Sequence, residues 1–154
     1  MAAICTNGHI NCDSLGDEYN SADKFCPECG APVIMQCPHC NSFIRGAYIV
    51  NFDCLDTLDK PDAYCFNCGE AYPWTDAALK NAILVLQEEA DLSPELKEST
   101  SASLPDIITE TPGTNLAIIR LKKCLSSAGK FTSDALRQFV IDFGCELAKR
   151  SLGL

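Results

Sequence analysis

Eight side chains in the first half of this chain have the types and the spacing of metal ligands. The segment Phe25-Cys26-Pro27-Glu28-Cys29-Gly30 recurs as Tyr64-Cys65-Phe66-Asn67-Cys68-Gly69. Each copy follows an earlier pair of soft ligands, Cys5 with His9 and Cys37 with Cys40. Thiolates and imidazoles suit a tetrahedral zinc ion. The eight ligands therefore predict two Zn²⁺ ions, each with a closed coordination shell.

The repeat predicts that each unit closes its own metal site. Site one, within 1–31, would consist of Cys5, His9, Cys26 and Cys29, and site two, within 35–70, of Cys37, Cys40, Cys65 and Cys68. In the alternative, a cross-braced arrangement, the Cys5/His9 pair joins the Cys37/Cys40 pair. Cys12 is the alternative to His9, which we favour because a turn-forming Asn-Gly lies between Cys5 and His9.

The remaining cysteines and the second histidine have simpler interpretations. Cys54, Cys124 and Cys145 stand alone, and we expect Cys124 and Cys145 to be small core residues within helices. His39 lies inside the Cys37–Cys40 turn, where we expect it to face solvent. A disulfide framework is the alternative to metal binding, but adjacent C-x2-C pairs are two-point chelators. Four thiolates can also hold iron, whereas the histidine of site one favours zinc.

Charge argues against nucleic acid as the partner. Residues 1–74 carry three basic and ten acidic side chains, a formal charge of −7, and residues 75–154 have a formal charge of −2. Nucleic-acid binding depends on clustered Lys and Arg side chains. No apolar run reaches the roughly 18 residues of a membrane span. The N-terminus lacks the pattern of a signal peptide, so we expect a cytoplasmic protein.

Composition changes at Tyr72-Pro73-Trp74-Thr75, which predicts a boundary between 1–74 and 75–154. The first part contains knuckles and short β-like stretches such as 33–35 and 43–50, and the second is helical. The expected fold class is therefore α+β: a tandem zinc ribbon followed by an all-α tail. Trp74 is expected to pack between the ribbon and the first helix, with an exposed binding platform as the alternative.

N-cap residues and apolar residues at helical spacing predict the helices of the C-terminal part. Thr75 is expected to be the first N-cap, and Ser93 before Pro94 the second. Residues 98–103 are expected to form a polar connector. A helical hairpin is predicted over 115–152, with its first helix ending at Gly129. Its second helix carries an apolar stripe of Leu136, Phe139, Val140, Phe143 and Leu147.

The motifs together resemble a known family. They are Cys5-Thr6-Asn7-Gly8-His9, the two aromatic C-x2-C-G segments, Cys37-Pro38-His39-Cys40, Ile44-Arg45-Gly46-Ala47-Tyr48 and Tyr72-Pro73-Trp74-Thr75. This order is similar to that of a bacterial family of uncharacterised double zinc-ribbon proteins with a helical tail. The similarity continues through 103–106 and 120–123, and so covers nearly the whole chain. The resemblance implies zinc and a bacterial source but supplies no activity.

Closed metal sites and the lack of a catalytic motif predict a non-enzymatic protein. We expect an adaptor or regulatory role, in which the C-terminal helices bind a protein partner or self-associate. Two alternatives stay open. One is a nucleic-acid-binding ribbon, which the charge opposes, and the other is a helical tail that associates with membranes through basic and apolar positions of 115–152.

Overall fold

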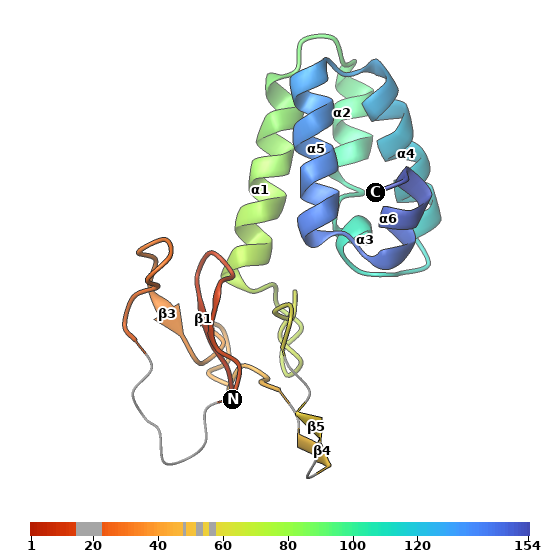
Figure 1. The fold of residues 1–154 in the computed structure, drawn as a ribbon. Coiled ribbons are helices and arrows are strands. Elements are labelled where there is room, and N and C mark those ends of the chain that lie inside the picture. Colours follow the sequence, from red (N-terminus) through yellow and green to blue (C-terminus); the bar gives the residue numbers. More distant parts are fainter. Residues whose placement is uncertain (15–22, 48, 52–53, 56–57) are drawn as a thin grey trace. The chain divides into compact units, whose positions relative to one another are not determined.

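The computed structural model describes residues 1–154 apart from 15–22, 48, 52–53 and 56–57, and it leaves out the side chains of 49–51 and 54–55 (Figure 1). Tyr48 and the side chain of Cys54 therefore lie outside the described part. The chain forms two compact units, Met1–Asp76 and Ala77–Leu154. Strands and knuckles make up the first and helices the second, which confirms the predicted α+β class.

Short antiparallel strands build the N-terminal unit. β1 (Ala3–Cys5) lies between β2 (Ile10–Cys12) and β3 (Val33–Ile34), and β4 (Ile49–Asn51) pairs with β5 (Cys54–Leu55). The central strand β1 is buried along its whole length. Cys5 ends this strand and is paired with Val33, so the sheet holds the first metal-ligand candidate beside the segment that follows the first C-x2-C pair.

The core of this unit is small and contains ligand candidates. It consists of Ala2, Ile4, Cys37, Ile44, Cys65, Tyr72 and Trp74. Trp74 is 3% exposed, its ring stacks on Tyr72 with centroids 4.6 Å apart, and its Nε1 donates to the Asp62 carbonyl oxygen at 2.9 Å. This burial contradicts the exposed-platform alternative.

Helix α1 (Pro73–Glu88) begins earlier than the cap pattern predicts. The backbone N–H groups of Thr75 and Asp76 both donate to the Tyr72 carbonyl oxygen, at 2.9 and 3.1 Å. Thr75 is thus in the first turn rather than at the N-cap, and its hydroxyl donates to the Ala63 carbonyl oxygen at 2.8 Å. The helix starts at Pro73 because proline lacks an N–H to satisfy and favours the first helical position.

Helices α2 (Pro94–Ser101), α3 (Pro105–Ile108), α4 (Thr114–Ser127), α5 (Lys130–Phe143) and α6 (Glu146–Leu152) complete the C-terminal unit. Ser93 caps α2 as predicted, since its hydroxyl accepts from the Leu96 N–H at 3.3 Å. The connector predicted over 98–103 is wrong. The helix continues to Ser101, and the turn after it buries Ser103 and Leu104. Thr100 is buried because α2 packs against α4.

The hairpin predicted over 115–152 is correct in part. Figure 1 shows α4 and α5 running in opposite directions, but α5 ends at Phe143 and α6 is a separate helix. Cys145 is extended at the N-cap of α6, not inside a helix, and its N–H donates to the Ile107 carbonyl oxygen at 2.8 Å. Gly129 is the N-cap of α5 rather than the end of α4, whose C-cap is Ala128.

Candidate metal centres

Three C-x2-C segments fold into the same backbone turn. The residue after each second cysteine donates its N–H to the carbonyl of the first cysteine, at 2.8, 2.9 and 2.9 Å for Gly30, Asn41 and Gly69. These three residues have φ values of 71°, 58° and 76°. Positive φ is unstrained for glycine and tolerated by asparagine. Glycine supplies this conformation in two of the turns, and Asn41 supplies it in the third.

The Cys5–His9 segment forms a related turn. Its closing backbone hydrogen bond joins Cys5 to Gly8, and so spans one residue fewer than the bond from Cys26 to Gly30. The Gly8 N–H donates to the Cys5 carbonyl oxygen at 2.8 Å, and the Cys5 N–H donates to the His9 carbonyl oxygen at 3.0 Å. The His9 N–H also donates to Cys5 Sγ at 3.2 Å. This turn therefore directs a sulfur and an imidazole to one point, as the other turns direct two sulfurs.

The eight candidate ligands meet in two groups of four. Within each group the ligand atoms all lie within 4.8 Å of one another, and the groups are Cys5, His9, Cys26, Cys29 and Cys37, Cys40, Cys65, Cys68. The pairing is sequential, so the cross-braced alternative is wrong. Cys12 belongs to neither group, and His39 is exposed and outside both. The described cysteine side chains form no disulfide.

Site one is held by contacts that aim its donor atoms inward. Cys5 Sγ lies 3.8 Å from Cys29 Sγ, and Cys26 Sγ lies 3.6 Å from His9 Nδ1. The other ring nitrogen of His9, Nε2, faces the Glu28 carboxylate at 3.9 Å. Asn7 donates from its side chain to Cys29 Sγ at 3.4 Å. Nδ1 is therefore the histidine atom available to a metal.

Site two has four sulfurs with a matching set of supporting contacts. Cys37 Sγ lies 3.8 Å from Cys68 Sγ, and Cys40 Sγ lies 3.7 Å from Cys65 Sγ. Asn67 donates its backbone N–H to Cys65 Sγ at 3.4 Å and its side chain to Cys40 Sγ at 3.6 Å. In both sites an asparagine side chain thus donates to a sulfur of the opposite turn.

Two thiols of site two, those of Cys40 and Cys68, differ in how readily they ionise in the absence of a cation. Hydrogen bonds from the Ser42 hydroxyl and backbone N–H, together with Asn67, lower the pKa of Cys40 to about 5. The backbone N–H of Glu70 favours the Cys68 thiolate, but burial and the neighbouring sulfurs raise the pKa of Cys68 to about 12. One thiolate suppresses ionisation of the next, and a cation at the centre of the group removes that repulsion.

In site one, nearby hydrogen-bond donors favour the thiolate form of Cys26, as they do for Cys40 in site two. Burial opposes ionisation of Cys26, yet the N–H groups of Glu28 and Cys29 and the His9 ring lower its pKa to about 6. The nearby sulfurs of Cys26 and Cys29 raise the pKa of His9. A cation bound among these donors would take the place of the imidazole proton.

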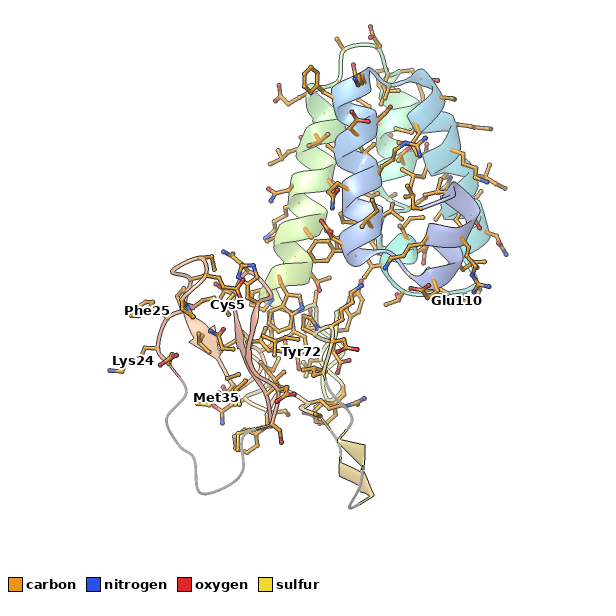
Figure 2. All side chains as sticks on the ribbon, in the orientation of Figure 1. Cys5, Lys24, Phe25, Met35, Tyr72 and Glu110 are labelled. Atoms are coloured by element: carbon orange, nitrogen blue, oxygen red, sulfur yellow. The ribbon has the colours of Figure 1, made fainter. Side chains whose placement is uncertain are left out.

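The structure brings together the eight candidate ligands named from the sequence, but the residues that support them were not predicted. Asn7, Ser42 and Asn67 hydrogen-bond the sulfurs. Tyr72, labelled in Figure 2, lies in the core of the N-terminal unit and hydrogen-bonds Cys65. Burial, followed by that bond, raises the pKa of Tyr72. The signal in the sequence was that Asn7 and Asn67 each lie between two candidate ligands, Asn7 between Cys5 and His9 and Asn67 between Cys65 and Cys68.

Two groups of four candidate metal ligands on knuckle turns, followed by a helical unit, fit the description of a double zinc-ribbon protein with an α-helical C-terminal part. A family model described as "Uncharacterized protein conserved in bacteria (DUF2321)" matches residues 1–152, so the chain belongs to that family and the predicted resemblance is confirmed. Searches of the curated proteins and of the solved structures found no match. Across the described residues, no helix is long and apolar enough to cross a bilayer.

Proposed function

We propose that this chain is a zinc-binding, non-enzymatic protein-interaction protein in which two zinc ions hold the N-terminal unit in shape. The closed four-donor geometry of both groups carries this proposal. A tetrahedral zinc with Zn–S bonds of about 2.3 Å places its sulfurs about 3.8 Å apart, and a sulfur and a nitrogen about 3.6 Å apart. The S···S distances of 3.7 and 3.8 Å and the S···N distance of 3.6 Å match these edges.

Zinc suits the donor set better than the alternatives. Site one combines three sulfurs with an imidazole nitrogen, a set typical of structural zinc. Site two has four sulfurs and could hold iron, but like site one it contains a C-x2-C turn and an asparagine side chain that donates to a sulfur across the site. The simplest assignment is therefore the same metal in both.

The ions have a structural rather than a catalytic role in this proposal. Catalytic zinc keeps one position for water or substrate, whereas each group here offers four protein donors. A structural zinc contributes about 10–16 kcal/mol in small peptides, which equals or exceeds the net stability of many domains. The core of the N-terminal unit has few large apolar residues and includes two of the sulfurs, so metal binding and folding should be coupled.

In this proposal a protein partner binds the C-terminal helices, but not through the apolar stripe that was predicted on the second helix of the hairpin. Leu136, Phe139 and Val140 are buried within the C-terminal unit and are not free to bind. The large apolar side chains that remain exposed on the helices are Leu84, Leu116, Ile119, Phe131 and Ile141. A formal charge of −9 favours a protein partner over nucleic acid.

Native mass spectrometry of gently purified protein, with elemental analysis, tests this proposal. The expected result is two zinc ions per chain, and one fewer in a Cys65→Ser variant. A Cys12→Ser variant is the matched control and should keep both ions. Fewer than two metals in the unaltered chain would contradict the zinc assignment. Turnover that depends on a metal-bound water would contradict the structural role.

A further inference from the structure

Each group of candidate metal ligands has one exposed cysteine. This residue is Cys29 in site one and Cys68 in site two, the second cysteine of a C-x2-C pair in both cases. Oxidants attack thiolates that solvent can reach. A metal-bound thiol is deprotonated outright, so in the zinc-loaded protein exposure rather than proton loss decides which sulfur reacts. Cys29 and Cys68 are therefore the ligands most open to an oxidant.

The supporting asparagines treat these two exposed cysteines differently. In site one, the Asn7 side chain donates to Cys29 Sγ at 3.4 Å. In site two, the Asn67 side chain donates to Cys40 Sγ at 3.6 Å. A hydrogen bond that stabilises a thiolate also lowers its nucleophilicity. The asparagine bond thus shields the exposed sulfur of site one, whereas in site two it is made to a half-buried cysteine.

Charge also favours reaction at site two. The backbone contacts of the two exposed sulfurs are alike, because Cys29 accepts from the Ala31 N–H and Cys68 accepts from the Glu70 N–H. With Zn²⁺, three thiolates and a neutral imidazole sum to −1 in site one, and four thiolates sum to −2 in site two. A more negative metal–sulfur site gives up electrons more readily. Cys68 is therefore the more reactive of the two exposed cysteines.

Cys37 is placed to form a disulfide with Cys68. Their Sγ atoms lie 3.8 Å apart, and a disulfide bond requires about 2.0 Å. The remaining sulfurs of site two accept hydrogen bonds from Asn67, Cys40 from its side chain and Cys65 from its backbone N–H. These bonds lower the nucleophilicity of both sulfurs. Cys37 is therefore the expected partner of Cys68.

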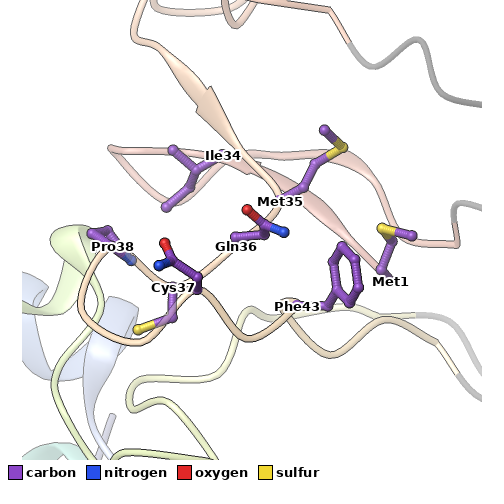
Figure 3. A pocket seen from close by; sticks show the side chains of 8 residues that line it. Met1, Ile34, Met35, Gln36, Cys37, Pro38 and Phe43 are labelled. Atoms are coloured by element: carbon purple, nitrogen blue, oxygen red, sulfur yellow. The ribbon is translucent and has the colours of Figure 1, made fainter.

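The turn that carries Cys37 has open space on one side. It borders a groove of about 490 Å³ in the N-terminal unit. Figure 3 shows Cys37 and Pro38 at one end of the lining of this groove and Met1 and Phe43 at the other. Close packing is what makes a protein interior resist movement. Because the groove leaves this side of the turn unpacked, Cys37 can shift by the short distance that a disulfide requires.

We propose that hydrogen peroxide oxidises Cys68, and that a Cys37–Cys68 disulfide then releases zinc from site two while site one stays loaded. This inference rests on the proposed function, because it describes the regulation of one of the two zinc sites. A disulfide removes two of the four donors of site two, and the two that remain cannot close a tetrahedral shell.

The oxidation takes place in two steps on the sulfur atoms. The Cys68 thiolate attacks one peroxide oxygen, the O–O bond breaks, and the departing hydroxide takes up a proton to become water. The sulfenic acid that results is attacked at sulfur by the Cys37 thiolate. Its S–O bond breaks, and the second hydroxide also becomes water. Two electrons pass from the two sulfurs to the peroxide, and the products are one disulfide and two water molecules.

Release of this zinc should loosen the core of the N-terminal unit. Cys37 and Cys65 belong to this core together with Tyr72 and Trp74. Tyr72 stacks on Trp74 and hydrogen-bonds Cys65. Trp74 is the one tryptophan of the chain and is 3% exposed, so its fluorescence reports on this part of the molecule. The oxidised state therefore has one zinc ion and a more exposed Trp74.

Treatment of the full-length, zinc-loaded chain with hydrogen peroxide tests this proposal. Native mass spectrometry should show one zinc ion released at least about tenfold faster than the other. Peptide mapping after thiol blocking should find a Cys37–Cys68 disulfide in the one-zinc species. Trp74 emission should shift to longer wavelength at the same rate and return when a thiol reductant and zinc are added. Simultaneous loss of both ions, earlier loss from site one, or a different first disulfide overturns the proposal.

Two variants test why Cys68 reacts first. Asn7→Ala removes the bond to Cys29 and should speed oxidation of Cys29 by about tenfold, measured by peptide mapping in excess free zinc so that site one stays loaded. An unchanged rate overturns the shielding of Cys29. Cys12→Ser is the matched control, because Cys12 is half-buried and outside both groups. It should lose zinc as the unaltered chain does, and slower loss would overturn the proposal by making Cys12 the reacting thiol.

The metal count before oxidation separates this inference from the proposed function. Fewer than two zinc ions in the untreated chain would overturn the proposed function, and this inference with it. A chain that keeps both ions at peroxide concentrations that oxidise free cysteine would overturn this inference alone and leave the proposed function standing.

Discussion

The Nδ1 atom of His9 lies 3.6 Å from Cys26 Sγ, while Nε2 of the same ring is turned towards the Glu28 carboxylate at 3.9 Å. His9 comes from the turn after β1, and Cys26 comes from the first C-x2-C turn. The two ends of one imidazole therefore have separate roles, one inside site one and one at its surface. A carboxylate beside the outer nitrogen of a metal-bound histidine fixes the tautomer that binds the metal.

The first prediction concerns this ligand. His9→Ala should remove one donor from site one and lower the zinc count towards one ion per chain under competition with a chelator. Cys12→Ser should keep both ions, because Cys12 belongs to neither group. Measurement is by titration of a chromogenic chelator followed by elemental analysis. Two tightly held ions in His9→Ala, with one lost in Cys12→Ser, would reverse the assignment.

The second prediction concerns the asparagine that supports site two. Asn67→Ala removes the side-chain bond to Cys40 Sγ, which spans 3.6 Å, and should weaken the zinc affinity of site two by about tenfold. The backbone bond from Asn67 to Cys65 Sγ is unaffected by this change. Asn7→Ala is the matched variant, because its 3.4 Å bond is to Cys29 of site one. Chelator competition on both variants should show one weakened site in each; equal affinities in all proteins would exclude this role.

The third prediction concerns the turn after the last C-x2-C pair. Gly69 has φ of 76°, and a Cβ placed there would meet no atom within 4 Å. Gly69→Ala should therefore destabilise the N-terminal unit through backbone strain alone, by about 1–2 kcal/mol. Asn41→Gly, at φ of 58° in the equivalent place, should be tolerated. Thermal unfolding of both zinc-loaded variants measures this difference, and a fully stable Gly69→Ala would mean that the turn relaxes.

Local spacing explains why the sites were predictable. C-x2-C followed by a residue that accepts positive φ specifies its own turn, so six of the eight candidate donors were readable from these segments alone. Cys5 and His9 depended on the Asn-Gly turn between them, and the repeat predicted the sequential grouping that the structure shows. The cross-turn bonds of Asn7 and Asn67 were not predicted, because each joins residues more than twenty positions apart. The pairing of β1 with β3 likewise joins distant segments, with Cys5 opposite Val33.

The helix boundaries failed where tertiary contacts override local pattern. Polar residues at 98–103 looked like a connector, but packing of α2 against α4 buries Thr100. The predicted second helix of the hairpin is broken after Phe143, where the Cys145 N–H bonds the Ile107 carbonyl of α3. A Cβ on Gly144 would lie 2.5 Å from the Val140 carbonyl oxygen, so a larger residue there would not fit the break.

The last prediction concerns the start of α5, which has no cap from its own residues. Gly129 is the N-cap and has no side chain, and its N–H donates instead to Glu89 Oε2 at 2.9 Å. Hydrogen bonds to Glu89, first from Thr132 and then from the Asp91 N–H, lower the pKa of its carboxyl below the ordinary value of 4.5. A carboxylate at a helix N-terminus also interacts favourably with the helix dipole.

Because the folded pKa of Glu89 is lowered, its contribution to stability is present above pH 4.5 and is lost as pH falls through the folded value. Glu89→Gln should therefore lower the melting temperature of the helices at neutral pH, and the difference from the unaltered chain should shrink in acid. Glu88→Gln is the matched control at the neighbouring exposed position. Circular dichroism melts across this pH range measure the effect. A Glu89→Gln difference that stays constant from neutral pH into acid would show that the carboxylate charge has no part in capping α5.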